Sequence, residues 1–308
     1  MKRSITLLLV LAALLSFAAC GKSAPAPTAA PNEAPAQTEA PAETPKASPA
    51  VADASQMTAV EEVVEEGMVP ISAENLVDGE YEIAVKSSSS MFRIEKAVLT
   101  VEDGRMGATL TMSGKSYLYV YPGTALSADA ADKSRLIPFQ EDSEGSHTFT
   151  IPVEALDAPV PCAAFSKNKE LWYDRTLCFR ADSLPVEAFR EGFLVTPKSL
   201  FVADGNFKVA VKLSGGSGRA SVASPTILKY QDGVCTAVIE WSSSNYDYMR
   251  VGDEKYLPLV AEGNSTFEIP VLYFDRPMTV VADTTAMSEP HEITYTLTFD
   301  SASLAVAP

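Results

Sequence analysis

Hydrophobic and polar residues alternate with a period of two over most of the chain after residue 70. Residues 81–85 show this alternation, and residues 293–299 have the pattern of a strand with one buried face. Around seven short runs of this kind in each stretch of ~115 residues, without a helical period, are typical of an immunoglobulin-like β-sandwich. Only residues 57–67 have a helical pattern, made by Val and Glu. The chain is therefore predicted to be all-β.

Two Asp-Gly pairs mark tight turns. Asp103-Gly104 and Asp232-Gly233 each separate two alternating runs. A type I′ turn needs a positive φ at both central residues, and Asp-Gly is suited to supply it. Each pair therefore predicts a β-hairpin with a two-residue turn.

The second half of this β-rich region repeats the first half, at offsets of 126, 118 and 120 residues. A solenoid unit repeats every ~20–50 residues, so a repeat of this length is a domain. We expect two tandem immunoglobulin-like β-sandwich domains, the first module at 71–190 and the second module at 191–308. The corresponding segments are 78–86 and 204–212, 149–153 and 267–271, and 176–179 and 296–299.

Two further segments flank the modules. Residues 57–70 are predicted to be a short lead-in, helical or extended. Residues 185–199 connect the modules and contain Phe189, Phe193 and Leu194, which is too apolar for a free linker. We expect the two modules to pack against each other at this connection.

The N-terminus predicts export. Lys2 and Arg3 precede an apolar run at residues 5–19, which is the pattern of a secretory signal peptide at residues 1–19. The run is shorter than the ~20 residues that a membrane span needs. It ends in small residues and Cys20, which resembles the bacterial lipoprotein signal and implies a lipidated Cys20 on the extracellular face of the cell membrane. The alternative is plain secretion.

Residues 20–56 consist mainly of Ala, Pro, Thr, Glu and Ser. Such a segment buries too little apolar surface to fold, so we expect a disordered linker rich in polyproline II. At ~3.1 Å per residue, its ~36 residues reach on the order of 100 Å. The predicted protein is a domain pair on a stalk, anchored to the membrane by lipid only.

The chain is acidic, with 24 basic and 40 acidic side chains. Loss of Lys2 and Arg3 with the signal leaves 22 basic residues and a net charge of −18. A field of this sign disfavours binding to nucleic acid or to an anionic bilayer surface.

Three cysteines remain after the signal. Cys162 and Cys178 flank a predicted turn, and a disulfide across two antiparallel strands is one interpretation. The other is that these two residues and Cys235 are three buried thiols.

The sequence does not indicate an enzyme. Its two histidines, His147 and His291, have no flanking nucleophile motif of a Ser-His-Asp relay. His147 is predicted to be a solvated loop residue. The Gly-rich segment at residues 214–218 lacks the Lys-Ser/Thr end of a phosphate-binding loop.

The closing strand carries the sharpest candidate site. Alternation places His291 and Tyr295 on one face, ~13 Å apart along the strand. Met287 lies in the turn just before. His, Tyr and Met side chains all serve as axial ligands of haem iron. The plainer alternative is that Tyr295 belongs to the core and that His291 is simply exposed.

The second module resembles the NEAT (near iron transporter) modules over about 100 residues. The shared order is an Asp-Gly strand start, a loop containing Ser221, an Asp-Gly hairpin and a closing strand with Tyr295. NEAT modules are immunoglobulin-like haem binders on Gram-positive surfaces. The resemblance implies that His291 stands at the first, iron-ligating position of their Tyr-x-x-x-Tyr motif and Tyr295 at the second. It also implies that Ser221 lies in the lip that holds a propionate.

The first module carries Leu171 and Arg175 where the second has His291 and Tyr295. Neither a Leu nor a guanidinium is a haem ligand, so we expect function to reside in the second module.

Other candidate ligand-binding residues are Arg219, suited with Ser221 to anchor a carboxylate, and an aromatic patch with Tyr246, Tyr248 and Met249. The patch is read either as a pocket wall or as edge packing.

These features predict a non-enzymatic cell-surface lipoprotein that binds haem or a related iron or tetrapyrrole ligand and works beside an ABC-type importer. The alternative is an immunoglobulin-like adhesion or spacer module that binds a protein or a glycan.

Overall fold

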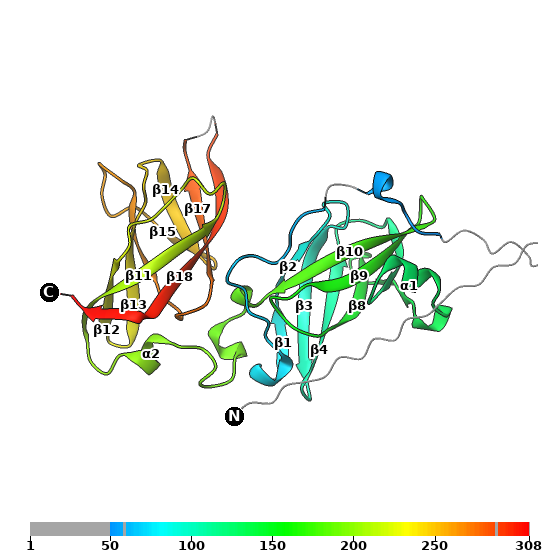
Figure 1. Ribbon diagram of the computed structural model, residues 1–308, viewed down its shortest axis with the longest axis horizontal. Helices are drawn as coiled ribbons and strands as arrows, with labels where there is room; N and C mark the ends of the chain where they lie inside the picture. The colour runs from blue at the N-terminus through cyan, green and yellow to red at the C-terminus, as the bar shows by residue number, and fades with distance from the viewer. Residues whose placement is uncertain (1–49, 58–59, 287–288, 308) are drawn as a thin grey trace, which may run out of the picture. The chain divides into compact units, whose positions relative to one another are not determined.

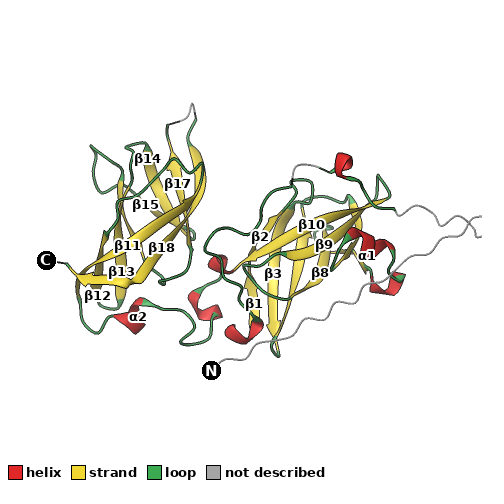
Figure 2. Cartoon of the chain, viewed as in Figure 1, coloured by secondary structure: helices red, strands yellow, loops and turns green. Residues whose placement is uncertain are grey.

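The computed structural model describes residues 50–57, 60–286 and 289–307. Strands dominate both modules, and all ladders between the named strands are antiparallel (Figures 1 and 2). The all-β prediction is therefore confirmed. The predicted signal peptide, the lipidation site Cys20, the linker up to residue 49 and Met287 lie outside the described residues. Within the described ranges, the helices are all too short or too polar to cross a membrane.

The first module is a sandwich of two five-stranded sheets. One sheet has the order β1 (Gly79–Glu82), β3 (Ile94–Glu102), β4 (Arg105–Met112), β8 (His147–Val153) and β7 (Gln140–Glu141). The other has the order β2 (Ala84–Ser87), β10 (Leu171–Arg180), β9 (Val160–Ser166), β5 (Tyr117–Tyr121) and β6 (Ile137–Pro138).

The inward faces of the two sheets form the core of this module. Leu99, Leu110 and Ile151 from one sheet and Leu177 and Phe179 from the other are almost fully buried in one hydrophobic cluster. Burial of each such side chain stabilises the fold by roughly 1.5–3 kcal/mol.

The second module is a single curled sheet of eight strands. The sheet curls so that Ser265, just before the end strand β16, contacts the start of β14 near the other end: its hydroxyl donates to the Tyr246 carbonyl at 2.7 Å and accepts from the Tyr246 N–H at 3.0 Å. The expected sandwich is thus a near-closed barrel in this module. The strand order is β15 (Glu254–Tyr256), β14 (Tyr246–Val251), β17 (Met278–Thr284), β18 (His291–Val306), β11 (Gly205–Gly215), β12 (Thr226–Gln231), β13 (Val234–Glu240) and β16 (Thr266–Pro270).

The difference between the modules comes from the first repeated strand. In the first module the chain leaves one sheet after Glu82 and enters the other at Ala84. In the second module the corresponding strand β11 runs unbroken, with a register shift between Lys208 and Ala210, and pairs along most of the long strand β18. A continuous bulged strand bends one sheet, whereas a broken strand divides it into two.

The duplication seen in the sequence is a duplication of strand pairing. Phe179 of β10 pairs with Val85 of β2, and the repeat-equivalent Phe299 of β18 pairs with Val211 of β11. These residues differ by the same offsets of 120 and 126 that the sequence shows.

A repeated serine explains part of the shared sequence. The Ala84 N–H donates to the Ser183 hydroxyl at 2.9 Å, and the Ala210 N–H donates to the Ser303 hydroxyl at 2.7 Å. In each module this bond satisfies a backbone donor at the point where the first repeated strand breaks or shifts register.

Both predicted hairpins are confirmed. Asp103 and Asp232 have φ values of 49° and 51°, and the glycines that follow them also have positive φ. The carboxylate of Asp78 accepts from the Asp103 N–H at 3.4 Å, and that of Asp204 accepts from the Asp232 N–H at 3.1 Å. The repeated Asp of each module therefore supports the hairpin turn of its own module.

The modules contain short helices that the sequence did not predict. Helix α1 (Ala125–Asp129) lies inside the first module and α2 (Pro197–Leu200) inside the second. One-turn 3-10 helices are found at Ala54–Gln56, Ala73–Asn75, Lys133–Arg135, Ala181–Ser183 and Val186–Ala188. The described residues 60–70 contain turns and bends and form neither a helix nor a strand.

The connection between the modules is packed. Phe189 and Leu194 are buried, the Phe189 and Phe193 rings stack at 5.8 Å, and Val195 pairs with Phe274 of the second module. This agrees with the packing expected from its apolar composition.

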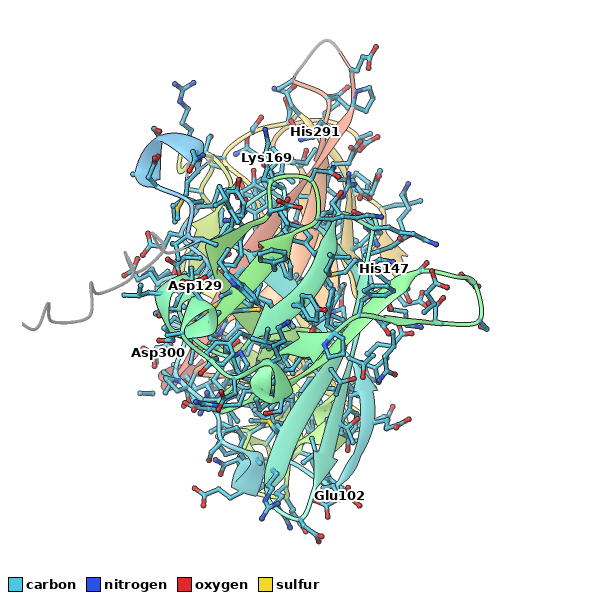
Figure 3. All side chains as sticks on the ribbon, turned by 90° about the vertical axis from the view of Figure 1, so that its right-hand side faces the viewer. Glu102, Asp129, His147, Lys169, His291 and Asp300 are labelled. Carbon is cyan, nitrogen blue, oxygen red and sulfur yellow. The ribbon has the colours of Figure 1, made fainter. Side chains whose placement is uncertain are left out.

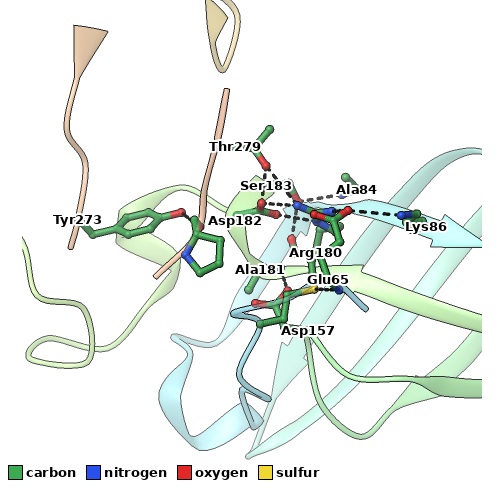
Figure 4. A network of polar contacts seen from close by, with 12 residues as sticks. Glu65, Ala84, Lys86, Asp157, Arg180, Ala181, Asp182, Ser183, Tyr273 and Thr279 are labelled. Carbon is green, nitrogen blue, oxygen red and sulfur yellow. Dashed lines mark hydrogen bonds and ion pairs between the residues drawn. The ribbon is translucent and has the colours of Figure 1, made fainter. Parts of the chain in front are cut away.

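A polar network surrounds Arg180 at the end of β10 (Figure 4). Its guanidinium binds Asp182 at 2.6 Å and Glu65 of the lead-in at 2.7 Å. The Thr279 hydroxyl of β17 donates to Asp182, which ties this network to the second module. The arginine is buried, and both carboxylates neutralise its charge.

In the first module one expectation from the sequence is wrong, and one of two open interpretations is decided. His147 is buried as the first residue of β8 (Figure 3); its ring stacks on Phe139 with 3.7 Å between ring centroids. It was expected in solvent because it follows a turn. The Cys162–Cys178 disulfide is also absent, because Cys162 lies opposite Arg175 and Cys178 opposite Lys86. The two thiols are free, as is that of Cys235, which matches the alternative of three buried thiols.

Candidate functional site

One end of the second module gathers most of the residues singled out in the sequence. Tyr246 of β14 pairs with Thr284 of β17, and Thr284 pairs with His291 of β18. Gly215, the last residue of β11, pairs with Tyr295. The start of β14, the end of β17, the start of β18 and the loop after β11 therefore meet at this end of the sheet.

Tyr295 lies inside the module rather than on a ligand-facing surface. Its hydroxyl lies 3.1 Å from the Tyr246 hydroxyl, and its ring packs edge-on against Trp241 at 5.0 Å. Both tyrosines are buried. Burial, followed by the hydrogen bond to Tyr246, raises the pKa of Tyr295 well above the usual value of 10, so the hydroxyl stays protonated at neutral pH.

The Gly-rich segment after β11 covers this tyrosine. Gly216 has a φ of +57°, and a Cβ at this position would lie 2.5 Å from the Tyr295 ring. Only glycine fits this approach. Packing against Tyr295 therefore explains the glycine at position 216.

The aromatic patch behaves as edge packing. Met249 is fully buried, and its sulfur lies 3.3 Å from the Trp241 indole nitrogen. Tyr246 is buried and Tyr248 is half-buried on the outer side of the same strand, because β14 shifts its register between these two residues. Of the two interpretations of this patch, the packing one describes Tyr246 and Met249.

The outer side carries a polar cluster. The Tyr248 hydroxyl donates to Glu292 at 2.9 Å, and the Arg250 fork binds both oxygens of the same carboxylate at 2.9 Å each. The Lys255 amine lies 3.3 Å from the centre of the Tyr248 ring. The bond to Glu292 raises the pKa of Tyr248 to about 12, and Arg250 lowers the pKa of Glu292.

Asp283 extends this cluster. Its side chain is 4% exposed and lies beside Asp247, and Tyr248 is its partner in the β14–β17 register. Burial and the neighbouring Asp247 carboxyl raise the pKa of Asp283. Each acidic group of the cluster therefore has a partner within the cluster itself.

The remaining predicted residues lie apart from these clusters. His291 is exposed at the first position of β18 (Figure 3). Arg219 and Ser221 are exposed in the loop after β11, where the backbone of Ser221 is bonded to Ser242. Met287 lies outside the described residues.

Tyr295 does not fit the ligand role that the sequence suggests for it. Tyr295 is protonated, bonded to Tyr246 and covered by Gly216, so its oxygen is not available to iron. Among the described residues, no group of three or more His, Cys, Asp or Glu side chains is placed to hold a metal ion. His291 is exposed in this region.

A cavity of about 680 Å³ lies beside Tyr295 and the Arg180 network. It is lined by Gly215, Gly216 and Thr294 as well as by Glu65 and Asp182. Its buried charges are already paired with one another, which leaves little unsatisfied chemistry for a ligand.

An apolar surface was missed in the sequence. Leu257, Leu259 and Val260, in the loop between β15 and β16, are 67%, 53% and 48% exposed. The Leu259 N–H donates to the Thr266 carbonyl at 2.7 Å, which holds the loop beside the Tyr246 end. A run of aliphatic residues without period-two alternation was the available signal.

Comparisons with known proteins leave the family open: no protein-family model matches the chain, and no curated protein matches it.

Proposed function

We propose that the chain is a non-enzymatic cell-surface protein whose second module contacts a protein partner through the loop between β15 and β16. The observation that carries this proposal is the adjacent exposure of Leu257, Leu259 and Val260. Contiguous exposed aliphatic side chains at the edge of a polar surface mark protein contact sites. The Arg250–Glu292 pair and Lys255 supply a polar rim nearby.

A protein partner is favoured over a glycan by the kind of side chain exposed. Sugars pack on open aromatic faces, but the Tyr248 ring is covered by Lys255 and the Tyr246 ring is buried. The exposed apolar groups are aliphatic. This proposal is a form of the adhesion or spacer function, with lipidated Cys20 and the Pro/Ala-rich linker as the tether to the extracellular face of the membrane.

The immunoglobulin-like and NEAT-like assignment belongs to the same proposal. It is supported by the two repeated antiparallel modules and by the shared strand pairing of β2–β10 and β11–β18. The strand order that the resemblance implies, with a hairpin between the lip loop and the closing strand, is compatible with β12–β13 and β18.

Haem or another iron or tetrapyrrole ligand, delivered to an ABC-type importer, is the second candidate. Its support is the exposed His291, in a position that the resemblance links to iron ligation. A hemin titration of the mature chain tests it: a Soret shift that His291→Ala removes would favour this candidate. A Soret band unchanged by His291→Ala, or no band, would exclude it.

Site-specific photo-crosslinking tests the protein partner. A photoreactive residue at position 259 of the full-length lipoprotein, on intact cells of the producing bacterium, is expected to give a discrete protein adduct. Val234 is 59% exposed in the β12–β13 hairpin and serves as the matched control. The adduct should also disappear in Leu257→Ser/Val260→Ser. Equal labelling from positions 259 and 234, or none from 259, would contradict the proposal.

A further inference from the structure

Arg175 of β10 is a buried cation without a counter-ion. It is 6% exposed, and within the part of the chain that the structure describes it forms no ion pair. Nη1 donates to the Asp174 carbonyl at 2.7 Å, whereas the buried Nε has no hydrogen-bond partner. The guanidinium carbon lies 5.0 Å from the centre of the Tyr173 ring, a cation–π contact that compensates only part of the lost hydration, whereas buried charges in proteins are ordinarily paired with an opposite charge.

The same strand supplies the comparison. Arg180, five positions further along β10, is buried to a similar degree and is neutralised by both Glu65 and Asp182. The fold is therefore able to pair a buried arginine on this strand. At Arg175 that pairing is missing.

Arg175 opens onto a pocket of about 300 Å³. Lys169, on the β9–β10 turn (Figure 3), supplies a second positive charge, and Ser116, Ser166, Asn168 and Tyr173 supply neutral polar groups. Among the described lining residues there is no carboxylate. The volume lies at the lower end of the range for small-molecule sites. In a chain with net charge −16, a pocket with two cations and no acid is suited to an anion.

The second module shows that the fold does not need this arginine. The repeat offset of 120 places Tyr295 where the first module has Arg175. Tyr295 is fully packed, and its hydroxyl is satisfied by Tyr246. The first module has a guanidinium with free hydrogen-bonding capacity at the same place, and a pocket beside it.

We propose that the first module binds a small oxyanion, a carboxylate or sulfate, in the pocket beside Arg175. Nη1 is held by the Asp174 carbonyl, so the remaining donors of the guanidinium are those that would bind the oxygens of such a group, and Lys169 adds a point charge at the rim. The acid group of a sugar and a free inorganic anion share this chemistry. The inference concerns the first module and does not depend on the protein contact proposed for the second.

Thermal unfolding and calorimetric titration of the mature chain test this site, with glucuronate, sulfate and glucose as probes. Glucuronate is expected to raise Tm by several degrees in the wild type and in Arg105→Met, whose exposed arginine is the matched control. The shift is expected to vanish in Arg175→Met and to weaken in Lys169→Gln. Glucose is expected to have no effect. If sulfate raises Tm as much as glucuronate does, the ligand is a free anion. If sulfate raises Tm less than glucuronate does, the ligand is an acidic sugar.

Without ligand, Arg175→Met is expected to melt no lower than the wild type. The substitution removes a buried charge that has no ion pair and keeps an unbranched side chain in its place. If that variant does not fold, the glucuronate-induced Tm shifts of Lys169→Gln and Arg175→Lys still test the site, because both substitutions keep the interior filled. Equal shifts in the wild type and in Arg175→Met, or no shift in the wild type with either anion, would overturn the inference.

Discussion

The Tyr295 hydroxyl lies 3.1 Å from the Tyr246 hydroxyl, and both rings pack against Trp241 inside the second module. This contact joins β18 to Tyr246 at the start of β14. The backbone of Tyr246 is also hydrogen-bonded to the hydroxyl of Ser265, which lies just before β16. Tyr295, which the sequence suggested as a ligand, therefore helps to close the sheet.

Tyr295→Phe is expected to lower the free energy of unfolding by about 1 kcal/mol, because the buried Tyr246 hydroxyl loses its partner. Urea unfolding measures this loss. Tyr119→Phe, on a 37% exposed side chain, is the control and should change little. In a double-mutant cycle, Tyr246→Phe should cost less in the Tyr295→Phe background than in the wild type. Strict additivity would show that the two hydroxyls do not interact.

A pH effect is expected from Asp157. Burial raises the pKa of Asp157 to about 6, against a usual value of 3.8, although its carboxylate accepts the Ala181 N–H at 2.9 Å. At a pH between 3.8 and about 6, the Asp157 carboxyl is protonated in the folded chain and ionised in the unfolded chain. Stability contributed by this group therefore rises as the pH falls from 7 to 4, by up to about 3 kcal/mol.

Asp157→Asn isolates this contribution. Asn also tolerates the φ of 52° at this position and can accept the Ala181 N–H. The variant is expected to be more stable than the wild type at pH 7, with the difference shrinking toward pH 4 in guanidinium unfolding. A difference that is constant over this pH range would contradict the raised pKa.

The hairpins and the repeated strand pairs could be predicted because their signals are local. Asp103 and Asp232 adopt the positive φ that Asp-Gly turns require, and the repeated strands then pair through equivalent residues such as Phe179 and Phe299. The closure of the second sheet could not be predicted in this way. It depends on contacts between Ser265 and Tyr246, which no periodicity in the sequence indicates.

The errors at individual residues have the same origin. His147 shares the buried face of β8 with Phe149 and Ile151, a period-two pattern that was present in the sequence but outweighed by the preceding turn. The hydroxyl partner of Tyr295 lies 49 residues away along the chain and is fixed only by the β14–β17–β18 register. Alternation correctly placed Tyr295 on an apolar face, and tertiary structure decided what its hydroxyl does.

Removal of Arg180 is expected to be strongly destabilising. Arg180→Met leaves the Asp182 side chain, which is 6% exposed, without its partner at 2.6 Å. Loss of one member of a buried pair costs about 3–5 kcal/mol. Lys96→Met breaks the exposed pair with Glu82 and is the control, with an expected change of about 0–1 kcal/mol. Similar losses for both variants in urea unfolding would show that burial does not strengthen the Arg180 pairs.

The three cysteines of the modules are expected to be free and unreactive in the folded chain. Burial raises the pKa of Cys162 and Cys235 to about 12 and that of Cys178 to about 11, so little reactive thiolate forms at neutral pH. Cys162 of β9 lies opposite Arg175 of β10, and Arg175 is three positions from Cys178, so the two thiols lie on opposite faces of the sheet. In Cys20→Ser, a thiol reagent should label these cysteines only after unfolding, and the intact mass should not change on reduction. A mass increase by two hydrogens on reduction would instead establish the disulfide and require a different register of β9 and β10.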